Sequence, residues 1–181
     1  IFYLFFFIFL LSSGNSRLYA EENRAFNFST LNLNNGLSQL SVLDICQDDK
    51  GYIWFATRNG LNKYDGTHFT IYKHSNRDNN SLSDNHITKL LPDNVRGGLW
   101  VGTNNGLNYL DPKTNLITNY QLADYPELPS NSILSLCLDK SGKLWVGTRL
   151  GLCFWQPENK TFKLVTLDGQ LDKESITSLY I

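Results

Sequence analysis

One phrase occurs three times in this sequence: GYIWFATRNGL at 51–61, GLWVGTNNGL at 98–107 and GKLWVGTRLGL at 142–152. The tryptophans Trp54, Trp100 and Trp145 are 46 and 45 residues apart, and a glycine follows each of them after six residues. A period of about 40–50 residues built from short strands is typical of a β-propeller blade. We therefore expect the repeated residues to describe a scaffold, and we look for function in the residues that differ between copies.

Each copy can be divided into four short strands, which we name a to d. Strand a is an alternating apolar run, and a D-x-x-G turn joins it to strand b, which carries the tryptophan. A tight turn through the repeated glycine leads to strand c, and strand d ends the copy. Strand d reads FTIY at 69–72, ITNY at 117–120 and FKLV at 162–165, and a fourth strand a begins at Ile176. The pattern predicts an all-β fold, an incomplete β-propeller of four-stranded antiparallel blades with three blades and the first strand of a fourth.

The repeated tryptophans and aspartates are expected to be structural. Residues that recur at one register of every copy are packing or turn positions, so the tryptophans are assigned to the core. Asp48, Asp93 and Asp139 are assigned to turns, because an aspartate can accept hydrogen bonds from the backbone of its own turn. The second of these turns is one residue longer than the others, within Asn94–Gly98, which suits a surface turn.

The first residues indicate export. Ile1–Leu11 is an unbroken apolar run, and Leu18–Ala20 before Glu21 resembles a signal-peptidase site. The run is shorter than the roughly 20 residues that span a bilayer. The chain begins with Ile and has no basic segment before the apolar run, so we expect its true start to be missing. The expected organisation is a signal peptide at 1–20, an outer strand that closes the ring at 21–36, blades at 37–81, 82–128 and 129–170, and a truncated fourth blade at 171–181.

Composition limits the classes of function. The chain has 181 residues, of which 41% are hydrophobic, and a net charge of −1, which is ordinary for a globular domain. The absence of basic clusters argues against nucleic acid as a partner. Cys46, Cys137 and Cys153 are expected to be buried apolar residues, and no Cys/His cluster has zinc spacing. We expect no cofactor and no metal.

The stretch NGLSQLSVLDICQDDKGYIWFATRNGLNKYDGTHF at 35–69, followed by SLSDNHI at 81–87, resembles the two-component regulator propeller repeat. The resemblance covers about 25–181 and departs from the usual pattern at Ala56, where Gly is usual, and at Gln156, where Asp is usual. It implies the N-terminal periplasmic sensor of a bacterial hybrid two-component system, anchored in the inner membrane. The expected ligand is an oligosaccharide or another small periplasmic molecule. The expected partners are the remaining blades, a histidine kinase and other signalling domains, and a second copy in a homodimer.

Two other readings remain open. The first is an exported propeller that binds or assembles without signalling, lectin-like or quinoprotein-like, since 98–115 is similar to a quinoprotein repeat. The second is an enzyme, but no carboxylate pair or nucleophile–base set stands out from the repeats. We expect this chain by itself not to be an enzyme.

Ligand-binding candidates come from loops in which the copies differ. In a blade, the b–c turns and the d–a connections emerge on one face, and arginine and asparagine there suit sugar hydroxyls or uronic carboxylates. The same residue types are also ordinary in turns. The candidates are Arg58, Asn59, Arg77, Asn104, Asn105 and Arg149.

Overall fold

A computed structural model describes residues 29–166 and 173–180, and the described residues from Leu31 onward belong to one compact unit. Its first sheet contains β1 (Val42–Gln47), β2 (Ile53–Thr57), β3 (Gly60–Tyr64) and β4 (Phe69–Tyr72). The second contains β5 (Ile87–Asp93), β6 (Gly98–Thr103), β7 (Gly106–Asp111) and β8 (Leu116–Tyr120). The third contains β9 (Ile133–Leu138), β10 (Leu144–Thr148), β11 (Gly151–Gln156) and β12 (Thr161–Val165).

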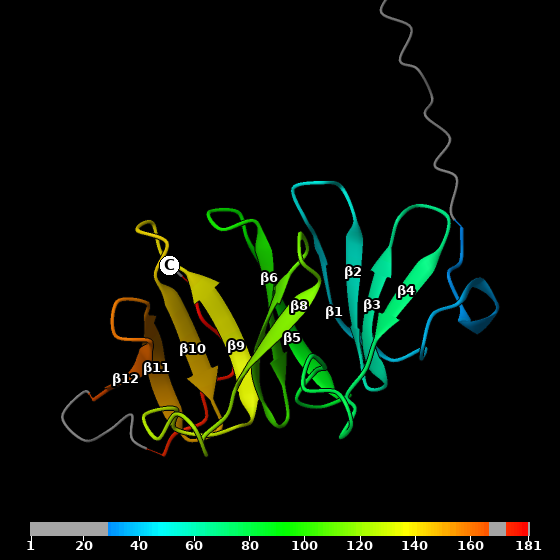
Figure 1. Cartoon of the computed structure of the whole chain (residues 1–181). Coiled ribbons are helices and arrows are strands. Elements are labelled where there is room, and N and C mark those ends of the chain that lie inside the picture. Colours follow the sequence, from blue (N-terminus) through cyan, green and yellow to red (C-terminus); the bar gives the residue numbers. More distant parts are fainter. Residues whose placement is uncertain (1–28, 167–172, 181) are drawn as a thin grey trace, which may run out of the picture. The chain divides into compact units, whose positions relative to one another are not determined.

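In each sheet the strands are hydrogen bonded in chain order and run antiparallel, and the three sheets stand side by side (Figure 1). The predicted fold, with its three four-stranded blades, is confirmed. Because the strands alternate in direction, the β2–β3, β6–β7 and β10–β11 turns share one end of the sheets with the connections between sheets. We call this end the connection face. The other end carries the turns that begin at Asp48, Asp93 and Asp139, and we call it the Asp-turn face.

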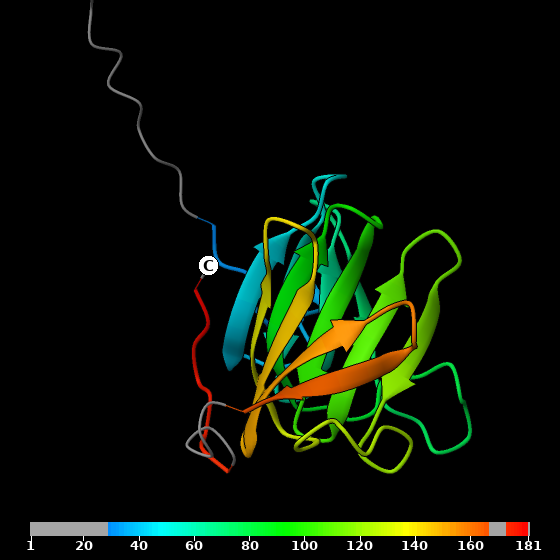
Figure 2. The ribbon, with the colours of Figure 1, turned by 90° about the vertical axis from the view of Figure 1, so that its left-hand side faces the viewer.

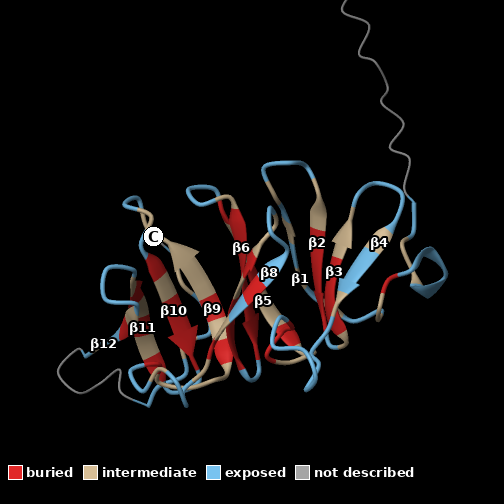
Figure 3. Cartoon of the chain, in the orientation of Figure 1, coloured by how far each residue is buried: buried red, intermediate tan, exposed pale blue. Residues whose placement is uncertain are grey.

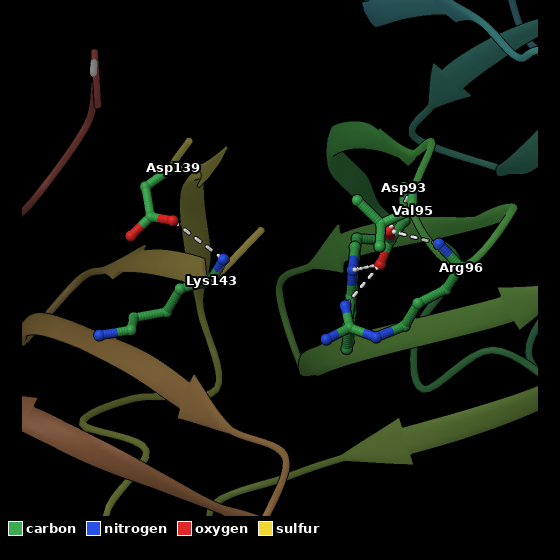
Figure 4. Close-up of polar contacts among 6 residues, drawn as sticks. Asp93, Val95, Arg96, Asp139 and Lys143 are labelled. Atoms are coloured by element: carbon green, nitrogen blue, oxygen red, sulfur yellow. Dashed lines mark hydrogen bonds and ion pairs between the residues drawn. The ribbon is translucent and has the colours of Figure 1, made fainter. Parts of the chain in front are cut away.

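One carboxylate in each copy joins the turn to the tryptophan. Its Oδ1 accepts backbone N–H groups of the turn, as Figure 4 shows for Asp93 and Asp139, and its Oδ2 accepts the indole N–H. The Nε1–Oδ2 distances are 2.9 Å for Trp54–Asp48, 3.0 Å for Trp100–Asp93 and 3.1 Å for Trp145–Asp139. The turn role of the three aspartates is confirmed, because an indole N–H needs an acceptor and each turn supplies one. Trp54 and Trp100 are buried in the core as predicted, whereas Trp145 in the third sheet is only half-buried.

The core lies between neighbouring sheets. One buried cluster joins the first and second sheets around Trp54 and Ile87, and another joins the second and third around Trp100 and Ile133. Figure 3 shows the buried residues concentrated within the strands, whereas the turns and the outer strand β4 are largely exposed. This arrangement explains why each copy is predominantly apolar on both faces of strand b.

Close approach between sheets explains the glycine of the W-V-G-T phrase. A Cβ on Gly102 would lie 2.8 Å from Cγ2 of Ile133, the first residue of the next sheet, and one on Gly147 would lie 2.7 Å from the carbonyl oxygen of Ile176. Such distances are shorter than ordinary carbon contacts. Ala56 holds the same position in the first sheet and is completely buried, so this interface has room for a methyl group.

Two expected segments are described only in part. The signal-peptide prediction at 1–20 lies outside the described residues, as do 21–28 of the expected closing strand; of the rest, Leu33–Asn35 form a 3-10 turn. Residues 173–180, red in Figure 2, run against the third sheet. Ile176 donates its N–H to the Thr148 carbonyl at 2.9 Å and accepts from Ser135 Oγ at 2.8 Å. Ile176 therefore lies against the third sheet much as Ile133 lies against the second.

Candidate functional site

The connection face is built on three equivalent turns that follow strands β2, β6 and β10. In each turn the hydroxyl of the repeated threonine donates to a glycine carbonyl and accepts a backbone N–H two residues on. The glycine has a positive φ of 113° to 132°, a conformation that glycine adopts without steric cost. The threonine–glycine pairs are Thr57–Gly60, Thr103–Gly106 and Thr148–Gly151. The T-x-x-G pattern is therefore the local cause of these turns.

Each connection between sheets is hydrogen bonded to the turns on both sides of it. In the first connection, the Asn85 carbonyl accepts from Gly60 N–H at 2.7 Å, and the next carbonyl, of His86, accepts from Asn104 N–H at 3.2 Å. The second connection repeats this pattern, with Asn131 accepting from Gly106 at 2.7 Å and Ser132 from Arg149 at 3.0 Å. Each connection is therefore hydrogen bonded to two neighbouring turns, and together the two connections hold the three turns in a row.

Two of the predicted site residues take part in the hydrogen bonds that join the turns to the connections, which we call the frame. Asn59 donates through Nδ2 to the Ser38 carbonyl at 3.3 Å and accepts from Lys73 Nζ at 3.1 Å. Asn105 accepts through Oδ1 from Asn131 Nδ2 at 3.2 Å. Their side chains are thus engaged in holding the turns to the connections.

Arg58, Asn104 and Arg149 occupy one equivalent position, the second residue of each turn, and all three are exposed. Within the described residues, none of their side chains makes a hydrogen bond or an ion pair. The structure thus places two guanidinium groups and one amide along the connection face, and no described residue is hydrogen bonded to these side chains.

Arg77 lies elsewhere. It is exposed in the first connection, whose Asn80 accepts from Ile117 N–H at 2.6 Å and donates to the Asn115 carbonyl at 3.3 Å. Both partners lie at the start of β8, the end of that strand nearest the Asp-turn face. The loop is therefore anchored along the outer strand of the second sheet, and no described contact joins Arg77 to the turn residues.

A buried polar network beneath the connection face was not anticipated. Asn62 Oδ1 accepts from Ser38 N–H at 2.8 Å, and Asn108 Oδ1 accepts from Ser83 N–H at the same distance. In the third sheet the equivalent positions are Cys153 and Pro129, so the acceptor and the donor are lost together. The signal was present in the sequence, since GLN at 60–62 and 106–108 becomes GLC at 151–153.

The remaining chemistry of the described residues is limited. The three cysteines are free, and burial raises the pKa of the Cys153 thiol to about 12. Such a thiol stays protonated and is a poor nucleophile or metal ligand. No group of three or more potential metal-ligating side chains occurs in the part of the chain that was described, and no helix there is long and apolar enough to cross a membrane.

Comparison with a family model identifies two stretches of the chain, 36–59 and 127–149, as two-component regulator propeller. Histidine kinase P4 of Formosa agariphila is 47% identical over 62 residues, which are 34% of this chain and 4% of the kinase. This chain therefore spans only a small part of that relative.

Solved structures support the same relationship. The extracellular domain of a hybrid two-component system from B. thetaiotaomicron matches with a TM-score of 0.52 and 27% identity, over 79% of this chain and 27% of that one. Virginiamycin B lyase from Staphylococcus aureus matches with a TM-score of 0.50 and 15% identity, over 70% of this chain and 42% of that one, which indicates a shared fold alone. Two stretches of the chain thus match the two-component regulator propeller model, and its propeller is related to the extracellular domains of two-component systems.

Proposed function

We propose that this chain is a ligand-sensing propeller in the periplasmic part of a hybrid two-component sensor. The similarity to a histidine kinase and to an extracellular two-component domain supports this assignment. In this proposal the kinase activity belongs to other domains of the same protein, and the propeller transmits ligand occupancy to them. Further blades, the signalling domains and a second copy of the protein are its partners.

The observation that carries the proposal is the row of exposed side chains on the connection face. Most polar groups in the turns are engaged in the frame, whereas the guanidinium groups of Arg58 and Arg149 have no partner among the described residues. A guanidinium presents several N–H donors in a fixed fork that matches a carboxylate. Because the turns are held in place by the connections, little ordering is required when a ligand binds. An oligosaccharide, above all one with carboxylate groups, suits this row.

The test uses the full-length product of the gene and a panel of neutral and acidic oligosaccharides, measured by isothermal titration calorimetry. The double variant Arg58→Ala/Arg149→Ala should weaken the binding of the recognised oligosaccharide by about tenfold or more, because charged hydrogen bonds are lost. The matched control is Lys50→Ala/Lys140→Ala, which removes two exposed cations from the Asp-turn face and should leave affinity unchanged. Equal affinity in both double variants would remove the connection face from consideration.

The same protein distinguishes sensing from binding alone. If the propeller is a sensor, the recognised oligosaccharide should change autophosphorylation of the protein in membrane vesicles. Binding without any change in autophosphorylation would favour the exported binding or scaffold propeller instead.

A further inference from the structure

The outer edge of the third sheet differs from that of the second. β8 and β12 are the last strands of their sheets, and Figure 1 shows β12 at the outer margin of the third sheet. Asn119 of β8 pairs with Asn108, and Leu164 of β12 pairs with Cys153, the third residue of the neighbouring strand in each case. Leu164 therefore corresponds to Asn119, and the two edges can be compared residue by residue.

In the second sheet, the first connection covers the edge of β8. Asn80 accepts from the Ile117 N–H at 2.6 Å and donates to the Asn115 carbonyl at 3.3 Å. Both backbone groups therefore point away from β7, and one amide binds them as a peptide group of an added strand would. Farther along the strand, Asn119 Nδ2 donates to the Ser81 carbonyl at 3.1 Å. Asparagine side chains thus close the seam between this edge and its connection.

The edge of β12 has no such cover among the described residues. The second connection has Pro126 in the place of Asn80, and a proline side chain neither donates nor accepts a hydrogen bond. Phe162 and Leu164 are at the outward-pointing positions of β12, because alternate residues of a strand direct their N–H groups to the same edge. No described group accepts from these two N–H groups. The edge therefore presents backbone donors of the kind that pair with another chain.

An apolar groove of about 580 Å³ adjoins this edge. Pro126, Pro129, Leu150 and Leu164 line it, together with Glu127 and Lys173. The first four replace polar residues of the second copy that take part in hydrogen bonds, in the order Asn80, Ser83, Asn105 and Asn119. Leu150 is 47% exposed and Leu164 is 38% exposed. The place that polar side chains close in the second sheet is therefore open and apolar in the third.

The charges at this edge favour an acidic partner over a second copy of the chain. β12 contains one charged residue, Lys163, which is exposed at the centre of the strand. In a symmetric antiparallel pair of two such edges, the central lysines would lie opposite each other, and like charges in that position are destabilising. Lys173 borders the groove, and the carboxylate of Glu127 accepts from Thr161 Oγ1 at 3.1 Å. An extended chain with acidic side chains is attracted to these lysines instead.

We propose that the edge of β12 binds an extended acidic peptide by strand addition. The peptide backbone pairs with the outward N–H groups of Phe162 and Leu164. A side chain of about the size of leucine lies in the groove against Leu150, and acidic side chains of the peptide lie near Lys163 and Lys173. In this mode of recognition the backbone pairing supplies affinity, and the groove selects the side chain.

The test measures binding of the fluorescein-labelled heptapeptide Glu-Glu-Thr-Leu-Thr-Glu-Glu to the full-length product of the gene by fluorescence anisotropy. This peptide should bind saturably, and a peptide with lysine in place of each glutamate should bind about tenfold more weakly or worse. Two N-methylated forms of the acidic peptide, one modified at the leucine and one at both threonines, test strand addition. Because alternate N–H groups point to opposite edges of a strand, only one form should lose affinity, by about tenfold or more.

Leu150→Asn is the decisive variant, because the other two copies have asparagine at this turn position. It should weaken binding of the acidic peptide by about tenfold, since the contact with the peptide leucine is lost. Leu164→Pro removes an outward N–H without breaking a bond of the sheet, and it should weaken binding to a similar extent. The controls are Leu116→Asn, at an exposed leucine of β8, and Ile71→Pro, at the position of β4 equivalent to Leu164. Both controls should leave binding unchanged.

Thermal unfolding midpoints of the two test variants should match those of their controls, so that lost binding is not lost folding. The proposal is overturned if the acidic peptide does not bind, if the lysine peptide binds as tightly, or if the two N-methylated peptides bind equally. It is also overturned if Leu150→Asn binds like the parent. A dimer that Leu150→Asn dissociates in sedimentation, with no peptide binding, would assign the edge to a second copy instead. Because Arg58 and Arg149 are unchanged in these variants, the outcome is separate from that of the sensor proposal.

Discussion

The loss of one donor and one acceptor together in the third sheet leads to a double-mutant test. In the first two sheets a buried asparagine accepts the backbone N–H of a serine in the preceding connection. At the equivalent positions of the third sheet, Pro129 has no N–H and Cys153 has no amide oxygen. We predict that these two residues are energetically coupled. A change at either one should lower the free energy of unfolding less when the other is changed as well.

The magnitude follows from the cost of an unsatisfied buried group, which is about 1–3 kcal/mol. Cys153→Asn alone buries an amide oxygen without its N–H donor, and Pro129→Ser alone introduces an N–H without an acceptor. Pro129→Ser also loses about 0.4–1 kcal/mol, because proline restricts the unfolded chain. The double variant forms the bond that measures 2.8 Å in the second sheet. It should be more stable than the sum of the single changes by about 1–2 kcal/mol.

The assay is urea-induced unfolding followed by tryptophan fluorescence for the parent, both single variants and the double variant. A companion variant, Asn108→Cys, removes the acceptor for Ser83 N–H and the donor to the Val101 carbonyl, so it should cost more than about 2 kcal/mol. Additivity of the two single changes within about 0.5 kcal/mol would refute the coupling. A neutral Asn108→Cys would refute the importance of the network in the second sheet.

Two further predictions concern the scaffold. Gly102→Ala should destabilise the protein by about 1–3 kcal/mol in the same unfolding assay, because the new Cβ would lie 2.8 Å from Cγ2 of Ile133. Ala56→Gly, at the equivalent position of the first sheet, should lower the free energy of unfolding by less. Equal losses in the two variants would contradict the close approach between the sheets. The Ser141 hydroxyl, the Trp145 indole and two backbone N–H groups hold the pKa of Asp139 well below its usual range. A lowered folded-state pKa contributes stability above the unfolded value of about 3.9, and this contribution is lost as the pH falls through the folded value. Unfolding midpoints measured between pH 6 and pH 2 should therefore fall less steeply for Asp139→Asn than for the parent, and parallel curves would contradict the assignment.

Much of the scaffold was predictable because the same local chemistry occurs in three copies. The members of the Asp–Trp pair are six or seven residues apart, and the T-x-x-G turn contains four residues. Both are therefore visible as local sequence patterns. The candidate site was predictable only in part. The position shared by Arg58 and Arg149 is visible as a difference between copies, whereas the anchoring of Asn59 and Asn105 depends on loops that are distant in sequence.

The sequence by itself determined the blade, its four strands and its number of copies, because each of these depends on contacts within about 45 residues. Only the tertiary structure decided which side chains remain free. Asn105 is tied to Asn131 from the next connection, while Arg149 at the neighbouring turn position is not tied to any described residue. Tertiary structure also brought Tyr120 and Tyr125 of the second copy into contact with Trp155 and Phe162 of the third. The physical reason is that such groupings depend on how neighbouring sheets approach one another, and that approach is set by packing between copies rather than by the order of residues within one.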